Sequence, residues 1–296
     1  MGLTEIVQQV INALSLGSTY ALLALGLALV FGVMGLVNFA YGELVAITGY
    51  TMYLLVTHGV SWSLAALVGI LAAAFASLLM ERFAFRPLRN ASFLTLLFSS
   101  FALSVILQNL FRALISPRTK GFRGPSLFVE AVNIGPLTVG WLNIVTMGVS
   151  LVSFIVLLLF LRRTIAGISM RAAAEDFAVA RLMGIKANRV IAMAFVVSGV
   201  LAGIAGVLWV ARSGNVSPAM GFTPIIKAFV ATVIGGLGSL PGAVVGGFIL
   251  GAVEVFMIST LPNSLQPFAD PLSLLAVIAI LYFKPNGLLA PTAERA

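Results

Sequence analysis

The sequence predicts an all-α polytopic membrane protein, a bundle of about eight or nine transmembrane helices, on three observations. The 296 residues are 60% hydrophobic and only 9% charged, whereas a soluble domain is about 45–50% apolar and roughly 25% charged. The mean hydropathy is +1.12. Apolar runs recur along the whole chain, close in length to the roughly 20 residues that a helix needs to cross a bilayer. Lipid must therefore surround much of this chain.

Nine apolar segments can be drawn, and each is expected to form a helix. They cover approximately residues 8–33, 38–57, 62–81, 93–113, 141–161, 190–211, 225–236, 241–260 and 268–283. The seventh segment is short and flanked by glycine, so it is expected to be half a span or a re-entrant piece.

Composition excludes several kinds of site. The chain has no cysteine, which removes disulfides, thiolate metal sites and cysteine nucleophiles. His58 is the single histidine, so a zinc site of several histidines is excluded. No G-x-x-x-x-G-K-[ST] phosphate loop and no hydrolase signature occurs, so neither ATP binding nor catalysis is predicted. The net charge of +8 does not predict nucleic-acid binding, because the basic residues lie between apolar runs.

The distribution of Lys and Arg predicts the orientation, because cytoplasmic loops are rich in these residues. Two basic inter-span loops are separated by two spans and therefore share one side, taken as cytoplasmic. With nine spans the N-terminus is periplasmic and the C-terminus cytoplasmic. Eleven of the 17 basic residues then lie inside: Arg82, Arg86, Arg89, Arg162, Arg163, Arg171, Arg181, Lys186, Arg189, Lys284 and Arg295.

Residues 114–140 do not fit this orientation well, because they would be periplasmic and yet contain Arg118, Lys120 and Arg123. The loop also carries prolines and short alternating runs, which favour a small external hairpin.

The longest polar stretch, residues 162–189, is expected to hold a short cytoplasmic helix. Its alanines favour helix, and Glu175 and Asp176 near the start with Arg181 near the end complement the helix dipole. Gly184 is placed to end the helix. Two interpretations remain open from composition: a connector on the membrane surface, or a helix that docks on a partner.

Two interruptions of the apolar pattern, residues 35–43 and 235–242, are rich in glycine and polar residues. One lies in each half of the chain, which predicts a transporter with an internal repeat and a substrate path where the broken segments meet. Non-helical backbone at membrane depth persists only against protein or a water-filled cavity.

Four residues are candidates for the substrate path: Ser18 in the first span, and Asn38, Tyr41 and Glu43 at the first interruption. An intramembrane carboxylate is by default a functional hypothesis. The alternative for Glu43 is a structural hydrogen bond, and the alternative for Ser18 is helix packing. Lys227 and Glu254 are similar candidates, for which a structural pairing is favoured over a functional role.

Several longer motifs occur in order along the chain. They are Gly17-Ser-Thr-Tyr-Ala-Leu-Leu-Ala-Leu-Gly26, Phe31-Gly-Val-Met-Gly-Leu-Val-Asn-Phe-Ala-Tyr-Gly-Glu43, Arg86-Pro-Leu-Arg89, residues 172–185, Gly235-Gly-Leu-Gly-Ser-Leu-Pro-Gly-Ala243 and Lys284-Pro-Asn-Gly-Leu-Leu289. Together they resemble the permeases of high-affinity branched-chain amino acid ABC importers, the LivH type, over nearly the whole chain.

The resemblance implies a permease domain, residues 1–296, that moves leucine, isoleucine and valine across the inner membrane. It implies four kinds of partner: a second, LivM-like permease, two ATP-binding subunits, a periplasmic substrate-binding protein and membrane lipid. ATP and Mg would bind to the ATPases, and this chain would bind no cofactor.

The resemblance also identifies residues 162–189 as the cytoplasmic loop that couples the permease to its ATPases. The expected contacts are Ala174, Glu175, Asp176, Arg181 and Gly184. Gly184 lies nine residues after Glu175, which departs from the widespread E-A-A-x-x-x-G pattern and leaves the docking residues open.

Three other functions compete with this one. A permease of the same superfamily for urea or short amides shares the N-F/M-A-x-G-E signature and is the nearest alternative. An ion-coupled secondary carrier is disfavoured by the docking-like loop, and a membrane enzyme is disfavoured because the sequence has no catalytic constellation.

Overall fold

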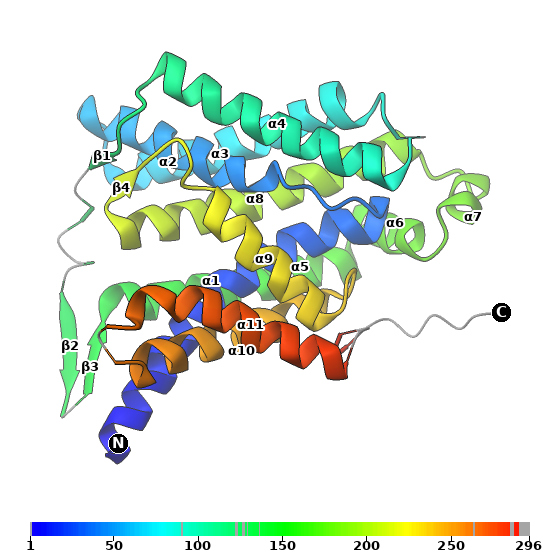
Figure 1. The fold of residues 1–296 in the computed structure, drawn as a ribbon. Helices are drawn as coiled ribbons and strands as arrows, with labels where there is room; N and C mark the ends of the chain where they lie inside the picture. The colour runs from blue at the N-terminus through cyan, green and yellow to red at the C-terminus, as the bar shows by residue number, and fades with distance from the viewer. Residues whose placement is uncertain are drawn as a thin grey trace. The chain divides into compact units, whose positions relative to one another are not determined.

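The computed structural model describes residues 2–89, 91–121, 124–125, 128, 130–135, 137–262, 264–284 and 287–289. Each of the nine apolar segments forms a helix in it (Figure 1). These helices are α1 (Leu3–Met34), α2 (Tyr41–Thr57), α3 (Trp62–Leu79), α4 (Phe93–Leu114), α5 (Trp141–Arg163), α8 (Ala187–Ser213), α9 (Phe222–Gly235), α10 (Leu240–Thr260) and α11 (Ala269–Phe283).

Six helices in the described part of the chain are long and apolar enough to cross a membrane: α1, α3 with its π-helical extension η1 (Met80–Phe85), α4, α5, α8 and α10. Helices α2, α9 and α11 have 17, 14 and 15 residues. At 1.5 Å per residue α9 extends only about 21 Å, less than the roughly 30 Å hydrocarbon core. The all-α, multi-pass fold is confirmed. The seventh segment is too short for a full span, and its being a half-span or a re-entrant piece stays a prediction.

The chain forms two compact units that alternate along the sequence. The first unit comprises residues 1–28, 125–152 and 227–296, and the second comprises residues 29–124 and 153–226. Helices α1, α5 and α9 therefore contribute residues to both units.

Helices α2, α3 and α8 form the core of the second unit (Figure 1). Glycines on α8 allow the close approach: a Cβ atom on Gly199 would lie 2.6 Å from the Cβ of Ser77, and one on Gly203 would lie 2.8 Å from the Cα of Ile70. The Ser77 hydroxyl donates to the Phe195 carbonyl at 2.6 Å. Small residues at helix contacts are the usual means of close packing where lipid surrounds a bundle.

In the first unit, α1 packs on α10 through glycine on both helices. A Cβ on Gly17 would lie 2.9 Å from the Cα of Phe248, and one on Gly247 would overlap the backbone of Ala21. A Cβ on Gly251 would lie 2.5 Å from the Cα of Gly17. The GxxxG pair of α10 is therefore a packing surface for α1.

The first unit also contains the predicted hairpin. Strands β2 (Ala131–Ile134) and β3 (Leu137–Gly140) pair antiparallel (Figure 1). The Gln8 side-chain amide donates to the Thr138 carbonyl at 2.9 Å and accepts from the Thr138 N–H at 3.1 Å, which fastens the hairpin to α1. Arg123, in the same loop, lies outside the described residues.

Earlier in that loop, in the second unit, β1 (Lys120–Gly121) pairs with β4 (Asn215–Val216), which follows α8. This short ladder joins the loop after α4 to the end of α8.

The chain leaves the helix at both predicted interruptions, but over fewer residues than expected. Residues 35–40 separate α1 from α2, so Tyr41 and Glu43 belong to the first turn of α2. Residues 236–239 separate α9 from α10, with Gly236 and Gly238 at φ +104° and +84°. An internal repeat relating the two remains a prediction.

Candidate functional site

The segment between α5 and α8 folds into two short helices, α6 (Ile165–Glu175) and α7 (Phe177–Leu182). The expectation of a single helix with Glu175 near its start was wrong, because Glu175 ends α6. Asp176 is extended, at φ −148° and ψ 106°, and its Oδ1 accepts from the Val179 N–H at 2.9 Å. An aspartate favours this capping geometry over a helix interior, so the chain bends at Asp176.

Helix α6 folds back on the end of α5. Thr164 caps it, since the Thr164 hydroxyl accepts from the Gly167 N–H at 3.0 Å. Only glycine fits at position 167, because α6 lies so close to α5 that a Cβ there would overlap the Phe160 carbonyl oxygen. The Arg171 Nε–H donates to the Leu161 carbonyl at 3.1 Å, so a guanidinium satisfies one of the last carbonyls of α5.

Gly184 ends α7 as the sequence predicts. It has φ +85°, its N–H donates to the Arg181 carbonyl at 3.0 Å, and the Ile185 N–H donates to the Ala180 carbonyl at 3.1 Å. This pair of bonds is the Schellman motif, whose left-handed residue is usually glycine. The turn from α7 toward α8 is therefore fixed by backbone bonds.

The five residues expected to contact an ATPase all lie on the exposed side of α6 and α7: Ala174, Glu175, Asp176, Arg181 and Gly184. The other side is buried through Met170, Ala173 and Ala180. The segment thus has one face held by the chain and one face that carries both signs of charge. A docking role for that face stays a prediction.

The exposed face also has an apolar part that sequence reasoning missed. Val179, Leu182 and Met183 are exposed by 52%, 86% and 79%. The i, i+3 spacing of Val179 and Leu182 could have indicated it, since such residues share a helix face. Exposed apolar side chains next to charges are typical of surfaces that meet a partner or a membrane.

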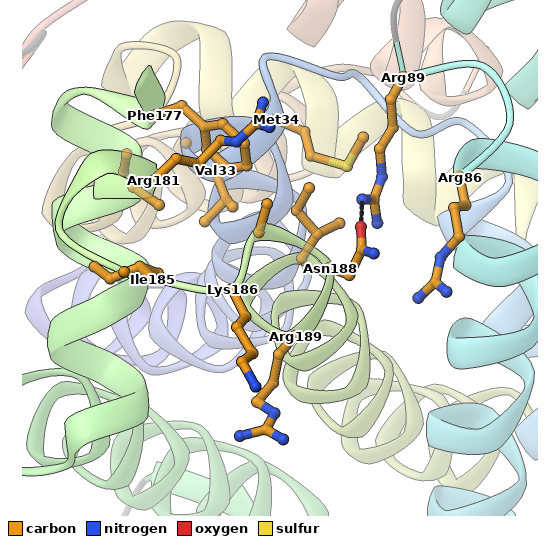
Figure 2. A pocket seen from close by; sticks show the side chains of 16 residues that line it. Val33, Met34, Arg86, Arg89, Phe177, Arg181, Ile185, Lys186, Asn188 and Arg189 are labelled. Atoms are coloured by element: carbon orange, nitrogen blue, oxygen red, sulfur yellow. Dashed lines mark hydrogen bonds between the residues drawn. The ribbon is translucent and has the colours of Figure 1, made fainter. Parts of the chain in front are cut away.

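A cavity of about 1230 Å³ lies beside this segment. Figure 2 shows its lining side chains. Its basic residues are Arg86, Arg89, Arg181, Lys186 and Arg189, and no carboxylate lines it among the residues that the structure describes. We refer to it as the basic cavity.

Two of these arginines pair with one buried carboxylate, which balances one of their two positive charges. Glu81 is 0% exposed; it accepts from Arg86 Nη2 at 3.2 Å and forms an ion pair with Arg89. Arg89 also donates to the Asn188 side chain (Figure 2). The loop after η1 is thereby attached to the first turn of α8, and a second predicted cytoplasmic loop contacts the 162–189 region.

The first interruption is supported by α4. The Phe39 N–H donates to the Ser100 hydroxyl at 3.2 Å, and that hydroxyl is 3.4 Å from the Val37 carbonyl. A Cβ on Gly42 would overlap the Gly221 carbonyl oxygen, so the start of α2 also touches backbone on its other side. Protein groups therefore surround this non-helical backbone, as membrane depth requires.

Glu43 is fully buried and lies against the same helix. Its Oε1 accepts from the Ser104 hydroxyl and from Gln108 Nε2, each at 2.8 Å. Ser100, Ser104 and Gln108 are four residues apart, so they form one polar stripe on α4 that faces α2. The four-residue spacing of these three residues is visible in the sequence and could have indicated the stripe.

Asn38 and Tyr41 are also buried in the second unit, at 2% and 1% exposure. Three of the four substrate-path candidates therefore belong to one buried neighbourhood. Ser18 belongs to the first unit, where its hydroxyl donates to the Leu14 carbonyl at 2.6 Å. That bond lies within α1, and it supports the packing interpretation of Ser18.

Lys227 and Glu254 pair as expected, in a larger cluster of the first unit. Lys227 Nζ lies 2.7 Å from Glu254 Oε1 and 3.2 Å from Asp270 Oδ1. The Tyr20 hydroxyl donates to Glu254 Oε2 at 2.9 Å and accepts from Lys227 at 3.0 Å. Four helices, α1, α9, α10 and α11, meet through these charges. Among the described residues no group of three or more His, Cys, Asp or Glu is placed to hold a metal.

Comparison with known proteins gives matches over nearly the whole chain. The family described as branched-chain amino acid transport system permease component matches residues 9–283. The permease proteins BraD of Pseudomonas aeruginosa and LivH of Salmonella typhimurium, both named for high-affinity branched-chain amino acid transport, are 34% and 37% identical. Each alignment covers 97% of this chain and 97% of the relative. A probable LivH of Methanocaldococcus jannaschii is 30% identical over 94% of this chain and 90% of its own.

No solved structure matches this chain. The sequence comparisons and the six apolar spans agree with each other, and together they make this a multi-pass membrane protein. The chain belongs to the family of branched-chain amino acid transport system permease components.

Proposed function

We propose that this chain is a transmembrane permease subunit of an ATP-driven importer that moves leucine, isoleucine and valine across the inner membrane. The observation that carries the proposal is identity of 34–37% to BraD and LivH along 97% of both chains. The resemblance read from the motifs of the sequence reaches the same family. No observation favours urea or short amides over branched-chain amino acids.

The chain needs partners to use ATP, because it contains no phosphate-binding loop of its own. Two ATPase subunits would bind ATP and Mg, and this chain would bind no cofactor. A second, LivM-like permease would complete the membrane part, and a periplasmic protein would deliver the substrate.

The exposed face of α6 and α7 is the proposed contact with an ATPase. It lies between the ends of two spans, and its geometry is fixed by the Asp176 bend and the Gly184 turn. Its exposed charges, Glu175, Asp176 and Arg181, can orient a partner, and Leu182 offers apolar surface. A contact of this kind passes force only if the segment is stiff, and the caps at both ends supply that stiffness.

We assign Glu43 a bracing role at the substrate path. Its bonds to Ser104 and Gln108 join the first turn of α2 to α4, directly after the interruption at residues 35–40. Its complete burial supports bracing rather than direct exposure to substrate in this conformation. Movement of the path would then require α2 and α4 to move together.

The orientation proposed is the one with residues 162–189 in the cytoplasm, residues 114–140 in the periplasm, the N-terminus outside and the C-terminus inside. It follows from the Lys and Arg distribution. The attachment of the Arg86–Arg89 loop to α8 supports it, because both predicted cytoplasmic loops meet in the second unit.

Uptake in proteoliposomes tests the function. The chain is reconstituted with its co-expressed ATPases, second permease and binding protein, and entry of radiolabelled leucine, valine and urea is measured with and without internal ATP. We expect ATP-dependent entry of leucine and valine. Entry of leucine that continues in an ATPase variant unable to hydrolyse ATP would contradict the importer, and preferential entry of urea would contradict the substrate class.

A further inference from the structure

A second cavity adjoins the basic cavity. It measures about 400 Å³, within the range of small-ligand pockets. Its wall is mostly apolar, formed on α6 by Ile165 and Ala166 and on α8 by Val190 and Met193. We refer to it as the apolar cavity. Ile165 at its edge is 86% exposed.

Lys186 and Arg189 line both cavities. Their cationic ends point in the same direction (Figure 2). Neither residue forms an ion pair within the described part of the chain, and no carboxylate lines either cavity among the residues described. Two cations without an ion-pair partner among the described residues therefore lie between the basic cavity and the apolar cavity.

The first turn of α8 adds to the positive potential at this point. Lys186 is the N-cap residue, and no side chain caps the turn. The N-terminal end of a helix carries a partial positive charge. Lys186, Arg189 and the helix dipole thus favour one negative group at the same place.

The position along the chain puts both cavities at a membrane boundary. Residues 164–186 connect α5 and α8, which are both candidate spans. A ligand that reaches this place from the bilayer presents a headgroup at the surface and hydrocarbon below it. Basic pockets beside membrane helices recognise anionic headgroups in this way.

We propose that Lys186 and Arg189 bind the phosphate of an anionic phospholipid, with part of an acyl chain in the apolar cavity. A lipid fits both hollows, whereas a soluble phosphate would use only the basic one. An acidic segment of an ATPase would use the charges but not the apolar wall of Ile165, Val190 and Met193. Ala174, Arg181 and Gly184, which are assigned to the docking role, also line the basic cavity. The lipid site is distinguished from the docking contact by Lys186, Arg189 and the apolar wall, none of which is assigned to docking.

The test uses the full chain purified in detergent and titrated with phosphatidylglycerol that carries a fluorophore on its acyl chain. Phosphatidylcholine with the same label is the matched zwitterionic lipid, and binding is measured by fluorescence polarisation. We expect phosphatidylglycerol to bind at least about tenfold more tightly, as two basic contacts imply. Equal affinity for the two lipids would overturn the proposal.

Two double variants separate the site from general charge. K186Q/R189Q should abolish the preference for phosphatidylglycerol. R162Q/R163Q removes the same charge from the exposed end of α5, outside both cavities, and should keep the preference. Equal loss in both double variants would show a diffuse surface effect and refute the site.

The acyl chain is tested with A166F, which fills the apolar cavity, and with glycerol 3-phosphate as a competitor without a tail. A166F should weaken binding of phosphatidylglycerol about tenfold, and glycerol 3-phosphate should not displace the lipid at equal concentration. Unchanged binding in A166F, or full displacement by glycerol 3-phosphate, would contradict an amphiphile site. Each variant must first elute and melt like the parent chain.

An ATPase pull-down distinguishes this proposal from the docking role. K186Q/R189Q should keep its ATPase while losing lipid preference. Loss of the ATPase with lipid preference intact would make the basic cavity a protein contact and overturn the lipid site. The docking contact is tested at Arg181, which lines the basic cavity but not the apolar one; Arg181→Glu should lose the ATPase and keep binding of the acyl chain.

Discussion

Lys227 and Glu254 form a buried ion pair with 2.7 Å between Nζ and Oε1. Both side chains are more than nine-tenths buried, and the Tyr20 hydroxyl bonds to each of them. Asp270, which is half exposed, is the further carboxylate of the cluster. Because removing one member of a buried pair leaves the other charge uncompensated, the pair is costly to break from one side only.

We therefore predict that Lys227→Met destabilises the chain by about 3–5 kcal/mol. The double variant Lys227→Met/Glu254→Met should recover much of that loss, because Asp270 can be hydrated. Unfolding in mixed detergent micelles, followed by circular dichroism, measures both. A single variant as stable as the parent chain would show that the cluster contributes nothing.

A second prediction concerns Glu43. Glu43→Ala removes the acceptor that the Ser104 hydroxyl and the Gln108 amide share and leaves Gln108 its 3.3 Å bond to Ser104 Oγ; losing the acceptor costs about 1–3 kcal/mol for buried polar groups. It should also lower leucine uptake severalfold while the subunits still assemble. Glu43→Gln is the matched control, because its amide oxygen can accept the same two bonds.

Uptake and co-purification of the subunits, measured on the same membranes, decide the role of Glu43. If Glu43→Ala transports normally with the complex at normal levels, the bracing role is refuted. If Glu43→Gln fails as badly as Glu43→Ala, the negative charge is needed rather than the hydrogen bonds.

The orientation gives a third prediction. The chain has no cysteine, so single cysteines can be placed without background. Ser126, a natural choice in the 114–140 loop, lies outside the described residues, so we choose the exposed Thr119 and Ala174. A membrane-impermeant maleimide added to intact spheroplasts should label Thr119→Cys, and Ala174→Cys only after lysis. Labelling of both from the same side would reject the proposed topology.

The fourth prediction addresses coupling through α6 and α7. Gly184→Asp places a side chain in a left-handed turn at φ +85°, a conformation that aspartate and asparagine both tolerate, and adds a negative charge to the exposed face. Arg181→Glu reverses a charge on the exposed face. Either change should abolish uptake and the stimulation of ATPase activity by loaded binding protein, while the binding protein keeps its affinity.

Gly184→Asn is the control for coupling, because asparagine tolerates left-handed backbone. It should retain most of the uptake. Normal transport by Arg181→Glu, or crosslinks that place the ATPase against the Arg86–Arg89 loop alone, would exclude the proposed contact.

The sequence predicted where the helices lie but not which side chains contact one another between them. The nine helices could be predicted because hydrophobic runs and glycine breaks are local features of the sequence. The bend at Asp176 was missed, since an alanine-rich run reads as continuous helix and the Asp176 cap competes with it only once the turn forms. Glu81 also gave no local sign that one carboxylate pairs with both Arg86 and Arg89.

The candidate site divides in the same way. Gly184 could be predicted because a helix stop has a residue preference. The buried face formed by Met170 and Ala173 could not, because it depends on which side of α6 lies against the rest of the unit. The polar stripe of Ser100, Ser104 and Gln108 lay within reach of sequence reasoning through its four-residue spacing.

The C-terminal motif, residues 284–289, forms two backbone hydrogen bonds with the end of α9. Leu288 N–H donates to the Ile234 carbonyl at 2.8 Å, and Leu289 N–H donates to the Gly235 carbonyl at 2.9 Å. These carbonyls are among those that α9 leaves unsatisfied at its end, and Gly287, at φ +82°, lies so close to Gly236 that a Cβ would collide with it. During synthesis, α9 therefore leaves the ribosome well before the residues that complete it. The half-length helix can settle only after α10 and α11 have been made, which places its final docking among the last events of assembly in the membrane.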